Sequence, residues 1–199
     1  MSSTRERLVD AMATSLARKG FAGVGVNEIL ERAQAPKGVL YHHFADGKTG
    51  LAIAAIRLSI ERITASLTRK RAASADPIEA LELWLEGMRQ RLEASGFEYG
   101  CPLAATALEV HAEQTELRAA LAEGFRALQA EVARTIEATG IPAPRALELA
   151  VFFVSAYEGA LMQARVASDS TLLRGICATL LGLLRAEQRH VIPPPKERP

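Results

Sequence analysis

The residue types best suited to chemistry lie in one short segment, which runs from Lys37 to Phe44 and reads Lys-Gly-Val-Leu-Tyr-His-His-Phe. On a helix that turns about 100° per residue, Leu40 and Phe44 share one apolar face. A cation, a glycine, an aliphatic side chain, a phenol and an imidazole lie away from that face. Such a surface suits a DNA groove, because lysine and tyrosine bind phosphates, glycine allows close approach to base edges, and valine can contact a thymine methyl group.

Other chemistries find little support among these residues. The adjacent His42 and His43 could suggest zinc, but neighbours on a helix diverge, and no carboxylate or cysteine stands one turn away to complete a site. Glu109 and His111 are two residues apart on a predicted helix and do not face each other, and no nucleophile partners them. The sequence therefore predicts no metal, no cofactor and no enzymatic activity.

A second helix must precede this segment to position it. Apolar residues recur at helical spacing from Val26 to Ala33, the pattern breaks at Gln34, and Pro36 stands where proline opens a new helix. The spacing predicts two short helices, joined by a tight turn, over residues 26–44.

Further helices are predicted from capping residues and apolar stripes. Ser3 and Glu6 form a capping box for the first helix, and Asp76 followed by Pro77 opens another. No stretch alternates with period two, so no sheet is expected. The predicted ranges are roughly 4–19, 48–71, 77–94, 102–112, 115–140, 143–167, and 168 or 169 to 187. The first helix and the helix pair should close around Leu16, Phe21, Ile29, Leu40 and Phe44.

The charge is unevenly distributed along the 199 residues. Residues 1–71 hold 12 Lys and Arg against 6 Asp and Glu, a net charge of +6, while residues 72–199 hold 12 against 17, a net charge of −5. This asymmetry indicates that the first third contacts a polyanion. Chance scatter of charge on helix faces is the alternative.

The cysteine count and the apolar runs indicate a cytoplasmic protein. Two cysteines, Cys101 and Cys177, cannot build a disulfide framework, which suits a reducing compartment. The first residues lack the apolar stretch of a signal peptide, and the most apolar run, Leu147 to Met162, is short and contains two glutamates.

The segment Lys37 to Phe44 resembles the helix-turn-helix of the TetR family of transcriptional repressors. Two further features are similar to the subgroup of lincomycin-resistance and flavonoid-responsive repressors. The first lies in residues 35–51, where Ala35-Pro-Lys-Gly is followed by the spacing Phe44-x-x-Gly47-Lys48-x-x-Leu51. The second is the segment Tyr99-Gly-Cys-Pro-Leu-Ala-Ala-Thr-Ala-Leu-Glu109. The resemblance covers residues 4–56 and 99–109. It implies an all-α, nine-helix fold with a three-helix head that contains the helix-turn-helix, followed by a helical body for ligand binding and dimerisation.

The resemblance also implies a function, namely a homodimeric repressor that a small apolar or aromatic effector releases from a palindromic operator. Carried over residue by residue, it implies DNA contacts by Asn27, Lys37, Gly38, Val39, Tyr41, His42, His43 and Lys48. The chain departs from the family pattern at Val24 and Gly25, where a hydroxyl is usual, and at Gln34, where glycine is usual. Gly25 can cap a helix only weakly, and a left-handed Gln34 would cost roughly 1 kcal/mol.

Aromatic residues beyond position 72 are candidates for a ligand site or for a plain core. The predicted ligand-binding residues are Trp84, Met88, Phe97, Tyr99, Cys101, Phe125, Phe153 and Tyr157. Cys101 precedes Pro102 at a helix start and is either a thiol sensor or a small packed residue of the pocket.

The last two helices are apolar over more than one stripe, which indicates a dimer interface built from matching helices. Its predicted residues are Leu147, Val151, Val154, Leu161, Leu172, Ile176, Leu180 and Leu183. The predicted domains are a DNA-binding head at 1–47, a linking helix at 48–71, the body at 72–190 and a disordered tail at 191–199. The alternative is a helical small-molecule binding protein or enzyme that has lost DNA binding.

Overall fold

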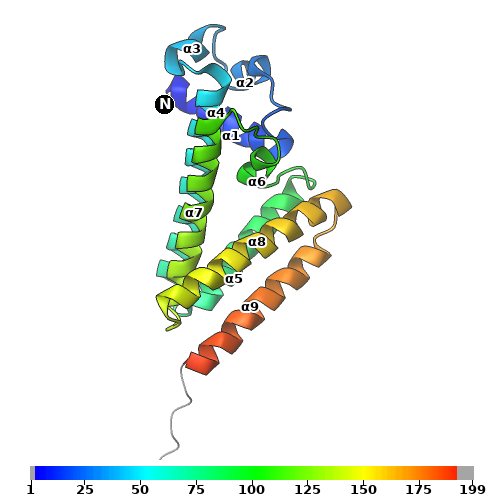
Figure 1. Ribbon diagram of the computed structural model, residues 1–199. Helices are drawn as coiled ribbons and strands as arrows, with labels where there is room; N and C mark the ends of the chain where they lie inside the picture. Colours follow the sequence, from blue (N-terminus) through cyan, green and yellow to red (C-terminus); the bar gives the residue numbers. More distant parts are fainter. Residues whose placement is uncertain (1–2, 192–199) are drawn as a thin grey trace, which may run out of the picture. The chain divides into compact units, whose positions relative to one another are not determined.

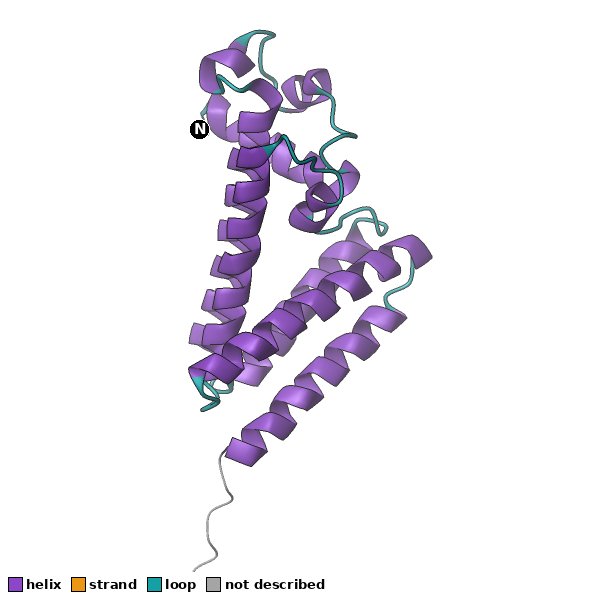
Figure 2. Cartoon of the chain, viewed as in Figure 1, coloured by secondary structure: helices purple, strands orange, loops and turns teal. Residues whose placement is uncertain are grey.

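The computed structural model describes residues 3–191, and within them the chain is entirely helical, as predicted (Figure 1). Figure 2 shows only helices and the loops between them over the same residues. The helices are α1 (Thr4–Lys19), α2 (Val26–Arg32), α3 (Val39–His43), α4 (Gly47–Ala73), α5 (Pro77–Ala94), α6 (Pro102–Ala107), α7 (Thr115–Glu137), α8 (Ala143–Ala167) and α9 (Thr171–Val191). The predicted disordered tail, 191–199, lies outside the described residues apart from Val191, which ends α9.

The chain divides into two compact units. The first unit contains the residues up to Ile63 together with Glu98–Ala127, and the second contains Thr64–Phe97 and the residues from Leu128 onward. The long helices α4 and α7 are divided between the units. The first part of each helix belongs to the first unit, and the second part belongs to the second unit.

In the first unit, α1 packs against α2 and α6. Its start carries the predicted capping box, with the Glu6 N–H donating to the Ser3 hydroxyl at 3.2 Å and the Ser3 N–H donating to the Glu6 carboxylate at 2.8 Å. The expected core residues Leu16, Ile29, Leu40 and Phe44 are buried. Phe21, the fifth, is only half-buried, and the ammonium group of Lys48 lies over its ring, 4.5 Å from the ring centre.

The turn between α2 and α3 contains two residues with left-handed backbone. Gln34 has φ 49°, the conformation in which glycine is usual, and Gly38 has φ 97°. The prediction that Pro36 opens the second helix is wrong, because the Val39 N–H bonds the Pro36 carbonyl in a turn at 3.3 Å and α3 begins only after Gly38. The segment from Lys37 to Phe44 is therefore a turn followed by the short helix α3.

Two other predicted helix boundaries also differ. The helix predicted at 102–112 ends at Ala107, where Leu108 is the C-cap and the Glu109 N–H donates to the Thr106 carbonyl at 3.1 Å in a tighter turn. Ser168 does not open the last helix, since its left-handed backbone ends α8. The Asp169 carboxylate accepts from the Thr171 N–H at 2.9 Å, at the start of α9, and α9 continues to Val191 instead of ending near residue 187.

The second unit is formed by α5, α8, α9 and the adjoining parts of α4 and α7. Asp76 caps α5 by accepting from the Ile78 N–H at 2.9 Å, with Pro77 in the first turn, as predicted. Glu131 of α7 is buried and accepts from Thr68 of α4 at 2.7 Å and from Arg71 of α4 at 3.2 Å. Helix α9 packs against both α8 and α5.

Candidate nucleic-acid interface

The side chains predicted to meet DNA surround α2 and α3, and most of them are accessible. Tyr41 is 68% exposed, and Asn27, Lys37, Gly38 and His42 are exposed as well. Val39 and His43 are half-buried. Leu40 of α3 and the following Phe44 are buried, and Tyr41 and His42 point away from this core.

Gly38 lies at the start of α3 and leaves open space there. A Cβ added to Gly38 would meet no atom within 4 Å, and its φ of 97° is one that other residues adopt at a cost of about 1–2 kcal/mol. The sequence-based prediction of a bare position for close approach of base edges is compatible with this geometry.

The two histidines of α3 pack edge to face, with ring centroids 5.1 Å apart. Among residues 3–191, no group of three His, Cys, Asp or Glu side chains is placed to hold a metal ion.

Lys48 is turned toward the protein in this structure. Its ammonium lies 4.5 Å from the centre of the Phe21 ring, and burial lowers the pKa of Lys48 while nearby Glu109 acts in the opposite direction. A phosphate contact by Lys48 therefore requires its side chain to leave the Phe21 ring. The sequence pattern placed this lysine at the start of a helix but contained no sign of its contact with Phe21.

Two arginines of α1 border the helix-turn-helix, and sequence reasoning missed both. The Arg5 guanidinium lies 5.3 Å over the Phe44 ring beside the end of α3. The Arg7 Nε donates to the Ala33 carbonyl oxygen, at the end of α2, at 2.9 Å. Both arginines are visible in the sequence, but only the folded chain brings them to α2 and α3.

The start of α2 departs from the family pattern in the predicted way. Gly25 occupies the N-cap position and makes no side-chain hydrogen bond, while Val24 is buried. The Lys19 ammonium bonds the Glu28 carboxylate at 2.9 Å and so joins the end of α1 to α2.

This arrangement of helices and exposed residues coincides with two family matches. Residues 8–55 match the family described as bacterial regulatory proteins, tetR family, and residues 77–179 match the LmrA/YxaF-like C-terminal domain of transcriptional regulators. The chain belongs to the TetR family. This family consists of transcriptional regulators that bind DNA and not of enzymes, and both the family and the subgroup expected from the motifs are confirmed.

The similar proteins extend over nearly the whole chain. An uncharacterised HTH-type transcriptional regulator of Mycobacterium tuberculosis is 33% identical over 94% of this chain and 97% of its own. The HTH-type transcriptional regulator LmrA of Bacillus subtilis is 28% identical, over 92% of this chain and 97% of its own. Among solved structures, a TetR regulatory protein from Rhodobacter sphaeroides is 28% identical with a TM-score of 0.80, over 91% of this chain and 98% of its own.

The residues predicted to bind a ligand are distributed over both units. In the second unit Trp84, Phe153 and Tyr157 are buried, with the Trp84 and Tyr157 rings 6.3 Å apart, while Met88 and Phe97 are half-buried. In the first unit Cys101 is buried, Phe125 is half-buried, and the Tyr99 ring lies 5.9 Å from the Arg18 guanidinium. The second unit thus contains the ring pair Trp84 and Tyr157 and the buried Phe153.

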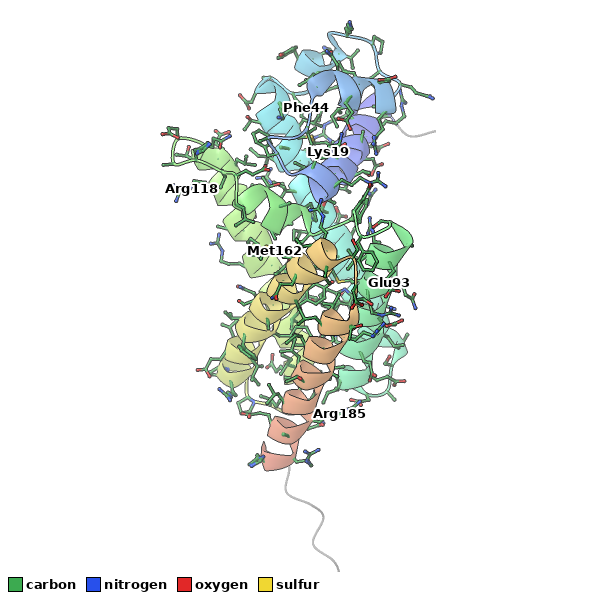
Figure 3. The ribbon with its side chains drawn as sticks, turned by 90° about the vertical axis from the view of Figure 1, so that its right-hand side faces the viewer. Lys19, Phe44, Glu93, Arg118, Met162 and Arg185 are labelled. Carbon is green, nitrogen blue, oxygen red and sulfur yellow. The ribbon has the colours of Figure 1, made fainter. Side chains whose placement is uncertain are left out.

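The residues predicted to form a dimer interface separate into two groups. Val154, Leu161 and Leu180 are buried within the second unit, so they belong to the core of the protomer. Ile176 is half-buried. The exposed group comprises Leu147, Val151, Leu172 and Leu183, to which the structure adds Phe152, Met162 and Val166. Figure 3 views α8 and α9 side by side from the front, with Met162 labelled on α8 and Arg185 on α9.

No helix within residues 3–191 is long and apolar enough to cross a membrane.

Proposed function

We propose that this TetR-family regulator is a homodimeric repressor of transcription, which acts in the cytoplasm and leaves a palindromic operator when a small apolar or aromatic effector binds. The observation that carries the DNA-binding part is the exposed surface of α3, where open Gly38 lies between Lys37 and the half-buried Val39. In such a surface, the residues around Gly38 read base edges, and Lys37, Tyr41 and His42 bind backbone phosphates.

Homodimerisation is supported by the exposed apolar residues of α8 and α9. Phe152 and Met162 of α8 and Leu183 of α9 are 54%, 53% and 48% exposed. A Cβ added at Gly159, Gly175 or Gly182 would meet no atom within 4 Å, so the surface of both helices has room for a closely packed neighbour. A second copy that covers this surface would complete a four-helix interface with two-fold symmetry.

The proposal assigns a role to each domain. Residues 1–47 bind DNA, residues 48–71 link this head to the body, and residues 72–190 bind the effector and form the dimer interface. The effector would be held in the second unit by the buried Trp84, Phe153 and Tyr157, together with the half-buried Met88 and Phe97 of the same unit. An effector that prefers a conformation in which the heads are wrongly spaced would release DNA.

Footprinting and gel shifts with the DNA upstream of the protein's own coding region test the proposal. A repressor dimer should protect a palindromic site whose half-sites lie about one helical turn apart. If the dimer makes about 6–10 phosphate contacts, its affinity should fall about 10³–10⁵-fold between 50 and 200 mM salt. Protection of a single half-site by a monomer, or increased transcription from the bound promoter, would contradict the repressor dimer.

A further inference from the structure

The loop between α1 and α2 is held by a carboxylate that lies far away in the sequence. The Ala22 backbone N–H donates to the Glu109 carboxylate at 2.8 Å, across 87 residues. Glu109 follows α6 and lies outside residues 8–55, the segment that matches the family's DNA-binding part. A hydrogen bond to an ionised acceptor is about twice as strong as one between neutral groups.

Gly20, in the same loop, gives the Glu109 carboxylate the space it needs. A Cβ added to Gly20 would lie 2.4 Å from one carboxylate oxygen of Glu109 and 2.7 Å from the other. The φ of Gly20 is 69°, which also favours glycine. Glycine at position 20 thus serves both the turn of the backbone and the approach of Glu109.

The Glu109 hydrogen bond is one of several contacts that join residues 98–109 to the end of α1 and the loop after it. The Arg18 guanidinium lies 3.1 Å from the Glu98 carboxylate, and the Gly100 N–H donates to the Ala17 carbonyl at 2.8 Å. Figure 1 shows α6 beside α1, in agreement with the packing of these two helices. The loop is therefore attached to the segment around α6 as well as to its own helices.

The loop is held within itself by the buried Val24, whose N–H bonds the Phe21 carbonyl at 3.4 Å, but its glycines leave the rest dependent on outside contacts. It contains Gly20, Gly23 and Gly25, and glycine loses more conformational entropy on ordering than any other residue. Gly25 gives α2 no side-chain cap. The position of α2 relative to α1 consequently depends on contacts from outside the loop.

We propose that Glu109 is a positioning residue for DNA binding, which fixes the loop at Ala22 and Gly20 and thereby sets the position of the helix-turn-helix against α1. Glu109 itself need not touch DNA. When the contact is lost, the fraction of molecules whose helix-turn-helix is correctly placed falls, and the apparent DNA affinity falls in proportion. The inference rests on the proposed specific DNA binding and adds to it a residue that neither the helix-turn-helix motif nor the predicted sites contain.

Three variants of the full-length chain test this role. Glu109→Ala removes the acceptor, Glu109→Gln keeps an acceptor oxygen without the charge, and Glu113→Ala changes an exposed glutamate nearby as a control. The probe is the upstream DNA fragment that the unsubstituted chain protects, and affinity is measured well below the melting temperature of every variant. We expect Glu109→Ala to bind roughly tenfold more weakly, in line with the loss of one charge-assisted hydrogen bond. Glu109→Gln should lose less than Glu109→Ala, and Glu113→Ala should lose nothing.

Hydrogen exchange and a double-mutant cycle separate positioning from general stability. The Ala22 amide should exchange faster in Glu109→Ala than in Glu113→Ala at equal helicity. Gly20→Ala should weaken DNA binding less in the Glu109→Ala background than alone, because the steric clash with the carboxylate is then absent. Unchanged DNA affinity and unchanged Ala22 exchange in Glu109→Ala would refute the role of Glu109 and leave the proposed function intact. If the unsubstituted chain bound no DNA sequence specifically, the proposed function would fail, and the role of Glu109 with it.

Discussion

The Arg7 Nε and the Ala33 carbonyl oxygen lie 2.9 Å apart in a hydrogen bond that joins α1 to the end of α2. The last carbonyls of a helix have no partner within the helix. Ala33 is the C-cap of α2 and directly precedes Gln34 with its left-handed backbone. Arg7 therefore stabilises the turn of the helix-turn-helix from α1.

Replacement of this arginine should destabilise the first unit. We expect Arg7→Ala to lower the free energy of unfolding by about 1.5–3 kcal/mol, the contribution of a hydrogen bond to a charged group. Arg57→Ala, at an exposed position on α4 of the same unit, should stay within about 0.5 kcal/mol of the unsubstituted chain. Denaturant unfolding followed by circular dichroism measures both, and equal effects would refute the role of Arg7.

Gly38 and Gly25 give a matched pair for the close approach to DNA. A Cβ at either position meets no atom of the protein within 4 Å, but φ is 97° at Gly38 and −87° at Gly25. Gly38→Ala should cost about 1–2 kcal/mol of stability from the backbone alone. If bases approach Gly38, DNA affinity should fall further than that strain explains. Gly25→Ala should be nearly neutral in stability, and a titration of operator DNA at constant salt compares the two variants.

Lys37 and Val39 flank Gly38 and should affect DNA binding in different ways. Lys37→Ala should weaken binding to all sequences and reduce the salt slope by about one, as expected for a lost phosphate contact. Val39→Ala should mainly relax the preference at one base pair. Binding isotherms on operator and random DNA at several salt concentrations distinguish these outcomes. An equal loss on both DNAs for Val39→Ala would contradict its role in base reading.

Local sequence predicted most helix boundaries but not those that depend on the backbone geometry of a turn. The Ser3 capping box and the Asp76–Pro77 start of α5 are encoded within a few residues, and the structure confirms both. The start of α3 was predicted too early, because a proline alone does not reveal the positive φ of Gly38. Helix periodicity likewise did not predict that α6 ends at Ala107, because apolar residues continue at helical spacing past its C-cap at Leu108.

The candidate site shows the same limit. The helical periodicity correctly predicted that Tyr41 is exposed and Leu40 buried, because both follow from the geometry of one helix. The contact of Lys48 with Phe21 joins residues on separate elements, and no local pattern encodes it. The two apolar stripes of α8 were both visible in the sequence. Only tertiary packing decides that Val154 faces the interior while Phe152 remains exposed.

A network of charges between α5 and the start of α9 predicts a dependence of stability on pH. The Arg89 guanidinium bonds both Glu86 and Glu93, and the Ser170 hydroxyl donates to Glu93. The hydrogen bond from Arg89 lowers the pKa of Glu86 to about 2, and those from Ser170 and Arg89 lower the pKa of Glu93. Carboxyl groups with lowered pKa values stabilise the folded state above the unfolded pKa of about 4.3, and this stabilisation disappears as pH falls toward 2.

Removal of the arginine should therefore matter at neutral pH but not in acid. We expect Arg89→Ala to reduce stability by about 1 kcal/mol at pH 6, since pairs near the surface contribute little. The difference from the unsubstituted chain should shrink steadily between pH 5 and pH 2. Melting temperatures at a series of pH values measure this difference, with Arg69→Ala, at an exposed position of α4, as the control. A difference that stayed constant down to pH 2 would rule out this contribution of Glu86 and Glu93.

If the proposed dimer forms, charges at two exposed apolar residues of the second unit should affect dimerisation in opposite ways. Phe152 of α8 is 54% exposed and Leu83 of α5 is 44% exposed, so the free protomer tolerates a charge at either position. In a dimer that pairs α8 and α9 with those of a second copy, Phe152→Asp would place an unpaired carboxylate in the apolar interface, which costs several kcal/mol. Leu83→Asp would leave the interface intact. Sedimentation equilibrium should therefore show a monomer for Phe152→Asp and a dimer for Leu83→Asp, with the same helicity in both.

Because two heads must occupy successive half-sites, Phe152→Asp should also bind the operator more weakly, while Lys37→Ala should still weaken that binding further. A dimeric Phe152→Asp variant would place the interface elsewhere on the chain.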